Sequence, residues 1–246
     1  YYYVVIEYPN EEENQNDDIG STINGNITIE EGSEYKNPEV TLTGTTTSGN
    51  NGWVKSASIS ANVETQTGKY TALYCTTSED SCTPNTSATI SYNTFSVTLG
   101  NHAKAQKVCV SITDEYNQKA SGCSESYQVD GVVPTSSTTI ASSTNGANGW
   151  YQALSIKVTG SDTHSGVTSI KYCATTSSSC TPSTNVNGNN TTVKLNSNKS
   201  AQRVCTQATD TAGNTSSTTC SDAYNVDTSN PTISITSTSV TKNSIT

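Results

Sequence analysis

The feature that most restricts the fold of this chain is a cysteine spacing that occurs twice. Shifting the sequence by 97 residues places Gly52-Trp53 on Gly149-Trp150, and the cysteines follow within one residue of that shift. The matched cysteines are Cys75 with Cys173, Cys82 with Cys180, Cys109 with Cys205, and Cys123 with Cys220. Because the same shift aligns all of these residues, the chain is predicted to contain tandem repeats, each of which folds as one structural unit.

The repeat divides the 246 residues into four parts. We expect an N-terminal acidic segment or linker at 1–25, repeat 1 at 26–131, repeat 2 at 132–228, and the start of a truncated third repeat at 229–246. Pro134 and Pro231 close each unit, four residues after a Val-Asp pair. Residues 11–18 carry five acids and no aliphatic side chain, which is typical of a solvated linker. Residues 1–8 fit either a strand or the outer flank of a removed membrane anchor.

Apolar residues alternate with Ser, Thr and Lys inside each repeat, as in half-buried strands. Clear examples are residues 108–112, 153–159 and 192–195. Turn-forming residues such as Asn145-Gly146 and Ala212-Gly213-Asn214 separate these segments and give about seven short strands per repeat. This pattern predicts an all-β fold of tandem immunoglobulin-like antiparallel β-sandwiches.

Composition narrows the class of protein further. Hydrophobic residues make up 31% of the chain and aromatic residues 7%, which excludes a helical bundle and by itself would favour disorder. Eight cysteines beside two histidines and no methionine instead indicate oxidised pairs in an extracellular or cell-surface protein. The net charge of −9 argues against a nucleic-acid partner. With no apolar run of about 18 residues, this segment is expected to contain no membrane span.

Repeat 2 resembles the bacterial immunoglobulin-like tandem repeats of secreted and cell-surface proteins. The matching pieces are Gly149-Trp150-Tyr151, Asp162 with Ser165-Gly166-Val167, Tyr172, residues 208–214, and the closure at 226–232. Repeat 1 departs from this pattern, because Val54 follows its tryptophan, Gln66-Thr67-Gly68 replaces Ser-Gly-Val, and residues 113–117 replace the Ala-Gly-Asn turn. The resemblance implies the sandwich fold for both repeats.

Four cysteines in a repeat allow three pairings. If Ile170 points inward, alternation turns Cys173 outward, and Cys205 beside inward Val204 also turns outward. A buried bond between the two sheets is then disfavoured, and pairing within hairpins is favoured. The predicted disulfides are Cys75–Cys82, Cys109–Cys123, Cys173–Cys180 and Cys205–Cys220.

Two kinds of ligand site have candidate residues, although no cofactor is expected. Asp162, Asp210 and Asp227 lie in loops and offer hard oxygen ligands for a structural calcium ion, or else they form turn hydrogen bonds to their own backbone. Trp53 and Trp150 precede equivalent strands and either stack on sugar rings or close the end of a sandwich.

The sequence lacks the motifs of catalysis. His102 and His164 lie at non-equivalent places in the two repeats, and no Gly-x-Ser-x-Gly or His-Glu-x-x-His pattern is present. We therefore predict a non-enzymatic stalk or adhesin segment that projects or links parts of a larger surface protein, with its repeats joined as an extended rod. Its expected partners are the neighbouring repeats, with a host or cell-surface glycan or protein as further candidates. The alternatives are a carbohydrate-binding accessory module of a secreted enzyme and a phage or pilus fibre subunit.

Overall fold

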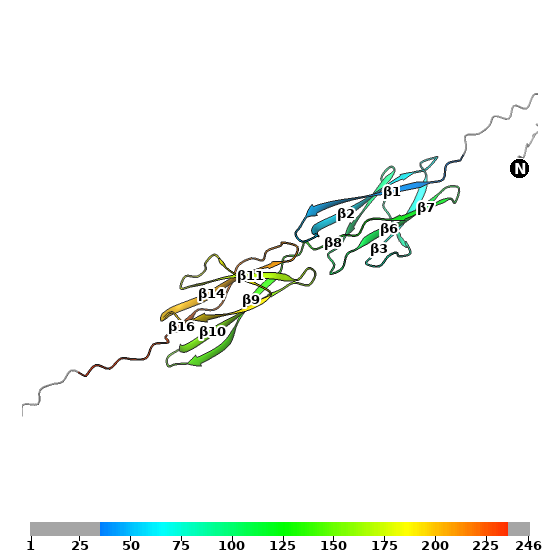
Figure 1. The fold of residues 1–246 in the computed structure, drawn as a ribbon. Coiled ribbons are helices and arrows are strands. Elements are labelled where there is room, and N and C mark those ends of the chain that lie inside the picture. The colour runs from blue at the N-terminus through cyan, green and yellow to red at the C-terminus, as the bar shows by residue number, and fades with distance from the viewer. Residues whose placement is uncertain (1–34, 236–246) are drawn as a thin grey trace, which may run out of the picture. The chain divides into compact units, whose positions relative to one another are not determined.

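A computed structural model describes residues 35–235, and every regular element in that range is a β-strand (Figure 1). The strands form two β-sandwiches, each with its own cluster of buried hydrophobic side chains. The all-β, antiparallel sandwich prediction is therefore confirmed. Within the described range no helix is long and apolar enough to cross a membrane. The predicted segment at 1–25, the proposed start of repeat 1 at residue 26, and residues 236–246 lie outside it.

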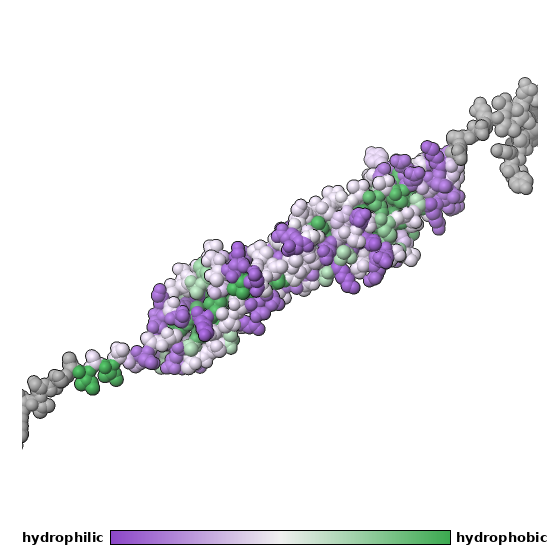
Figure 2. All heavy atoms as spheres, in the orientation of Figure 1, coloured by the Kyte–Doolittle hydropathy of each residue, from purple (hydrophilic) through white to green (hydrophobic). Residues whose placement is uncertain are grey.

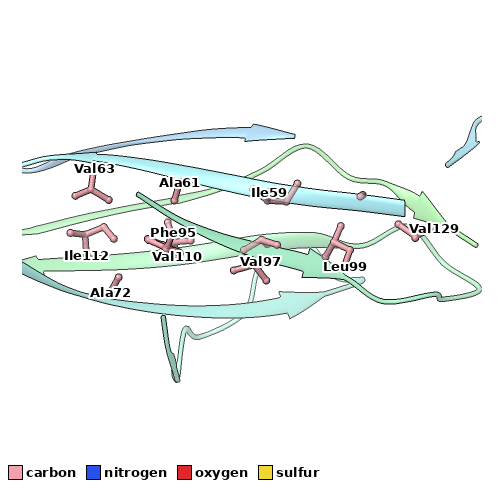
Figure 3. Close-up of a cluster of buried hydrophobic side chains, with 12 residues drawn as sticks. Ile59, Ala61, Val63, Ala72, Phe95, Val97, Leu99, Val110, Ile112 and Val129 are labelled. Carbon is pink, nitrogen blue, oxygen red and sulfur yellow. The ribbon is translucent and has the colours of Figure 1, made fainter. Parts of the chain in front are cut away.

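The first sandwich has two sheets that pack face to face. One sheet contains β1 (Glu39–Ser48), β2 (Trp53–Glu64), β5 (Thr94–Leu99) and β8 (Gln128–Val129). The other contains β4 (Thr86–Ser87), β3 (Tyr70–Thr77), β6 (Lys107–Asp114) and β7 (Lys119–Cys123). Alternate residues of β5 are buried, and Figure 3 shows Phe95 and Val97 facing Val110 from the opposite sheet. The period-two pattern thus supplies one apolar face to each sheet.

The second sandwich repeats this arrangement. One sheet contains β9 (Thr135–Asn145), β10 (Trp150–Ser161), β13 (Asn190–Leu195) and β16 (Tyr224–Val226). The other contains β12 (Thr184–Asn187), β11 (Val167–Thr175), β14 (Lys199–Asp210) and β15 (Thr219–Cys220). β16 runs parallel to β10 and also pairs with β14, so it connects the two sheets. The side chains of Ile156, Ile170 and Val204 are fully buried between them.

The hairpins that open the two sandwiches have the same backbone. In the β1–β2 turn, Asn51 has φ 53° and Gly52 has φ 81°, while Asn148 and Gly149 in the β9–β10 turn have φ 58° and 77°. Asparagine and glycine are the residues that tolerate this left-handed region best, which explains the repeated Asn-Gly-Trp sequence. Each hairpin therefore presents its loop with the same shape.

The four predicted disulfides are present. They link Cys75 to Cys82, Cys109 to Cys123, Cys173 to Cys180, and Cys205 to Cys220. As its predicted outward orientation requires, Cys205 is not part of the apolar core cluster, yet it is completely buried. Cys205 lies between Cys173 and Cys220 on adjacent strands, and the sulfur atoms of Cys173, Cys180 and Cys205 lie within 4.8 Å of one another. The neighbouring disulfide covers this cysteine although it points away from the core.

Candidate functional site

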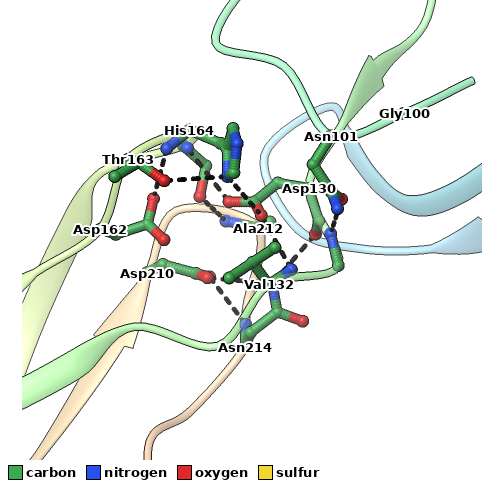
Figure 4. A network of polar contacts seen from close by, with 12 residues as sticks. Gly100, Asn101, Asp130, Val132, Asp162, Thr163, His164, Asp210, Ala212 and Asn214 are labelled. Carbon is green, nitrogen blue, oxygen red and sulfur yellow. Dashed lines mark hydrogen bonds and ion pairs between the residues drawn. The ribbon is translucent and has the colours of Figure 1, made fainter.

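A network of polar groups forms where the first sandwich ends and the second begins (Figure 4). Asp130 directly follows β8, and its side chain is completely buried. One carboxylate oxygen accepts a hydrogen bond from the Val132 amide at 3.0 Å, and the other accepts one from the Ser165 amide of the second sandwich at 3.0 Å. A buried carboxylate needs such donors to offset lost hydration, so Asp130 depends on both sandwiches for its partners.

Two further aspartates of the second sandwich hold the loops that face Asp130. Asp162 accepts hydrogen bonds from the His164 and Gly166 amides at 3.0 and 2.8 Å. Asp210 accepts one from the Asn214 amide at 2.7 Å. These bonds are the local turn contacts typical of aspartate in loops, and they fix the shape of each loop.

Asn214 connects these loops to the end of the first sandwich. Its side-chain amide nitrogen lies 3.0 Å from the carbonyl oxygen of Asp130 and 2.9 Å from a carboxylate oxygen of Asp210. The residue is only 6% exposed. Both amide hydrogens can thus be used at once, one within the second sandwich and one across the junction.

The β1–β2 hairpin loop also contacts the second sandwich. The Asn50 amide donates to the Ala212 carbonyl at 3.0 Å, and the Asn51 side chain donates to the Thr211 carbonyl at 3.0 Å. Gly213 has φ 87°, and a Cβ atom on it would lie 2.4 Å from the Asn50 side chain. The Ala-Gly-Asn turn is therefore suited to this contact both in conformation and in size.

His164 is the only ionisable base within reach of the buried carboxylate in the described range. Its Nδ1 atom lies 3.7 Å from Asp130 and 3.2 Å from the Thr163 hydroxyl. Both contacts are made by the same ring nitrogen, whereas a relay of nucleophile, base and orienting carboxylate uses the two different ring nitrogens of its histidine. The His102 ring contacts the Lys104 backbone of its own loop, and the His102 amide donates to the Val129 carbonyl at 3.0 Å.

The structure separates the three aspartates proposed for calcium. Asp162 and Asp210 lie at the junction, whereas Asp227 follows β16 at the opposite end of the second sandwich. At the junction, Asp130 lies where the prediction had Asp227. Ligand atoms of Asp130, Asp162 and His164 lie within 4.8 Å of one another. The sequence contained the signal for Asp130 in the two matching Val-Asp pairs, but not its proximity to Asp162.

The donor set of the junction fits a hard cation only in part. One carboxylate oxygen of Asp162 is buried and has no hydrogen-bond partner. The carboxylates of Asp130 and Asp210 already accept amide hydrogen bonds, although each oxygen retains a second lone pair. Calcium accepts six to eight oxygen ligands, so carboxylates, backbone carbonyls and water would all have to contribute.

The two tryptophans lie at equivalent places but differ in exposure. Trp53 is half-buried and pairs with Gln128, while Trp150 pairs with Asn225 and is 37% exposed. Trp150 borders a shallow depression of about 310 Å³. The depression is lined by Gly146, Ala147, Trp150, Tyr151, Gln152, Asp227 and Ser229.

Hydrogen bonds also set the ionisation of the group at that end. The Ser229 hydroxyl and amide donate to one carboxylate oxygen of Asp227 at 2.5 and 3.0 Å, and they hold the pKa of Asp227 below its usual value. Nearby, burial raises the pKa of Tyr224, whose ring packs edge-on against Tyr151 at 5.9 Å.

Comparisons with known proteins leave the family open. No protein-family model and no curated protein matches the chain. Solved structures that match include the fibronectin(III)-like modules of CbhA from Clostridium thermocellum, at 13% sequence identity and a TM-score of 0.29. That match covers 77% of this chain and 95% of the other. A likeness of this size carries no argument about function.

Proposed function

We propose that this chain is a non-enzymatic, extracellular segment of tandem immunoglobulin-like repeats of the bacterial type, which projects or links parts of a larger surface protein. The observation that carries the proposal is the junction around Asp130. Its buried polar groups bond mainly to one another and to backbone amides across the two sandwiches. Such an arrangement fixes neighbouring repeats together and leaves few groups for a substrate.

The disulfides support an oxidising, extracytoplasmic location. Each bond closes a short loop, with sequence separations of 7, 14, 7 and 15 residues. In the chain-entropy model a loop of this length contributes about 2.5–3 kcal/mol. That contribution is large for sandwiches whose cores consist mainly of Val, Ile, Leu and Ala, and it suits a protein exposed to proteases.

The connection between the sandwiches is short. Gly131 donates to the Asn101 side chain at 2.6 Å, and Pro134 directly precedes β9. A Cβ atom on Gly131 would lie 2.4 Å from the Lys55 carbonyl, so the connection is packed closely against the first sandwich. With a fixed torsion at Pro134 and bonds on both sides, we expect little freedom at this joint.

Small-angle scattering of the full chain tests the stalk. We expect the maximum dimension of two sandwiches joined end to end, with little change between low and high salt. The matched variant Asn214→Ala should broaden the distance distribution, because it removes a bond across the junction, whereas Gln118→Ala on an exposed turn should not. A compact profile with the repeats side by side would contradict the proposal.

Carbohydrate binding is a second candidate, and one observation favours it. Trp150 is partly exposed beside a shallow polar depression, which is a surface on which a sugar ring can stack. A glycan array probed with the chain and with Trp150→Ala separates the two functions. A specific hit that the variant loses would favour an accessory binding module, and a blank array would favour the stalk.

Calcium would act at the same junction as a structural ion. Asp130 and Asp162 would hold it, with Asp210 behind them, and the ion would neutralise carboxylates that are buried together. The buried, unpartnered oxygen of Asp162 is the observation in its favour. Asp227 would not take part, because it lies at the other end of the sandwich.

A further inference from the structure

The end of the second sandwich is built in the same way as the end of the first. The Asp130 amide donates to the Val54 carbonyl at 2.9 Å, and the Asp227 amide donates to the Tyr151 carbonyl at 2.9 Å. One residue later, Thr228 donates to the Asn198 side chain at 2.9 Å, as Gly131 does to its own asparagine. Two matched hydrogen bonds and the same hairpin shape therefore define one end surface twice.

On the first sandwich, four polar groups of this surface are occupied by the second sandwich. They are the Asn50 amide, the Asn51 side chain, one carboxylate oxygen of Asp130, and the Asp130 carbonyl. Figure 4 shows the two Asp130 groups turned toward the loops of the second sandwich. The surface thus has a definite occupant whose donors and acceptors match it.

On the second sandwich, the counterparts of these groups have no occupant within residues 35–235. They are the Ala147 amide, the Asn148 side chain, the second carboxylate oxygen of Asp227, and the Asp227 carbonyl, none of which makes a hydrogen bond in that range. Asp130 is 0% exposed, whereas Asp227 is exposed. The depression beside Trp150 lies on this same surface.

The residues that follow this surface also have unpartnered apolar side chains. Ile233 and Ile235 come two and four residues after Pro231 and are 88% and 90% exposed. In the first sandwich, Val40 and Leu42 come two and four residues after Pro38, and both pack against the core. The two isoleucines therefore occupy the sequence positions that supply the inner face of the first strand in the first sandwich.

We infer that the end of the second sandwich, formed by residues 146–150 and 227–229, is a docking surface for a further immunoglobulin-like repeat whose first strand begins near Thr232. The inference rests on the proposed tandem array, and it adds that this surface selects which type of repeat can follow. The occupant must supply an amide like that of Ser165 and carbonyls like those of Thr211 and Ala212. A second copy of the second sandwich carries these groups.

The first sandwich does not match the surface at the same positions. Tyr116 and Asn117 stand in place of Ala212 and Gly213, and Tyr116 is 53% exposed. The larger side chains would meet the hairpin loop, where even a Cβ on Gly213 would lie 2.4 Å from Asn50. Docking is therefore directional and selective, so that one repeat type follows another in a fixed order.

Hydrogen exchange of the Ala147 amide, measured by NMR, tests this inference. The parent is the chain of 246 residues, and the test protein carries residues 1–231 followed by a second copy of residues 135–235. We expect exchange of this amide to slow about tenfold or more in the test protein, as the amide gains a carbonyl partner. Equal exchange in both proteins, with the copy's Ile156 amide protected to show folding, would overturn the inference.

Two variants of the test protein check selectivity. Asn148→Gly keeps the left-handed backbone and removes the side-chain donor, so it should weaken the protection of Ala147. Replacing Ala212-Gly213 of the copy by Tyr-Asn should abolish it. Retained protection in both variants would overturn the selectivity. Failure of the stalk itself would appear separately, as a compact scattering profile of the parent chain with Ala147 unaffected.

Discussion

Asp130 and Asp227 follow equivalent strands and make the same backbone contact, yet one is completely buried and the other is exposed. The difference comes from the neighbour and not from the repeat itself, because the loops around Asp162 and Asp210 cover only Asp130. A loop carboxylate is thus a surface residue in an isolated repeat and a buried structural residue at a junction. Stability measured on a single repeat would miss this contribution.

The largest expected effect comes from removing the buried carboxylate. Asp130→Ala leaves the Val132 and Ser165 amides without acceptors in a dry site, and we expect a loss of about 3 kcal/mol in the free energy of unfolding. The matched variant Asp227→Ala should change it by less than about 0.5 kcal/mol. Urea unfolding measures both, and equal losses would break the comparison.

Calcium provides a second way to distinguish the two ends. At a calcium concentration one hundred times its Kd, binding at Asp130 and Asp162 should stabilise the fold by about 2.7 kcal/mol relative to chelator. Asp162→Asn should abolish this gain, because it changes the carboxylate with the unpartnered oxygen, and Asp227→Asn should preserve it. Thermal unfolding with and without chelator is the measurement. An unchanged melting temperature would exclude the calcium site.

The amide that bridges the junction should have a somewhat smaller effect. Asn214→Ala removes its bonds to the Asp130 carbonyl and to Asp210, and we expect a loss of about 2 kcal/mol. Gln118 occupies the corresponding turn of the first sandwich with an exposed side chain, so Gln118→Ala should be nearly neutral. Similar urea midpoints for both variants would contradict a bridging role.

The smallest effect concerns ionisation at the open end. Hydrogen bonds from Ser229 lower the pKa of Asp227 in the folded chain, so they favour folding above the usual carboxyl pKa and lose this effect as the pH falls through the lowered value. Ser229→Ala should raise the Asp227 pKa toward its usual range. Carboxyl chemical shifts followed by NMR measure this change, and an unaltered midpoint would show that the serine hydroxyl is not its cause.

Much of the fold could be predicted from sequence because its signals are local. Alternation placed the strands, Asn-Gly-Trp marked the equivalent hairpins, and the duplicated spacing gave all four disulfides. The burial of Cys205 was not predictable in this way, since alternation specifies which face a side chain takes but not what covers that face. Its cover is a neighbouring disulfide.

The candidate site was only half predictable, because its contacts are non-local. Asp162 and Asp210 were singled out as loop aspartates, but Asp130 bonds to the backbone amide of Ser165, and an amide has no sequence signature. Asp227 was grouped with them because loop position does not reveal which end of a sandwich a loop occupies. The direction in which each strand runs decides at which end of the sandwich the following loop lies, and this direction is known only from the structure.

The row of cysteines across β11, β14 and β15 has a mechanical consequence. Two closed loops with sequence separations of 7 and 15 residues lie side by side in the second sandwich, and neither can lengthen when the chain is pulled. At about 3.4 Å per extended residue, the residues inside the two loops correspond to roughly 75 Å of chain that cannot extend when the repeat is stretched. If tension disrupted the core packing of a repeat, the unfolded repeat would therefore have a shorter end-to-end length than one without disulfides. The Cys205–Cys220 bond would also keep the strands of the last hairpin in register for refolding.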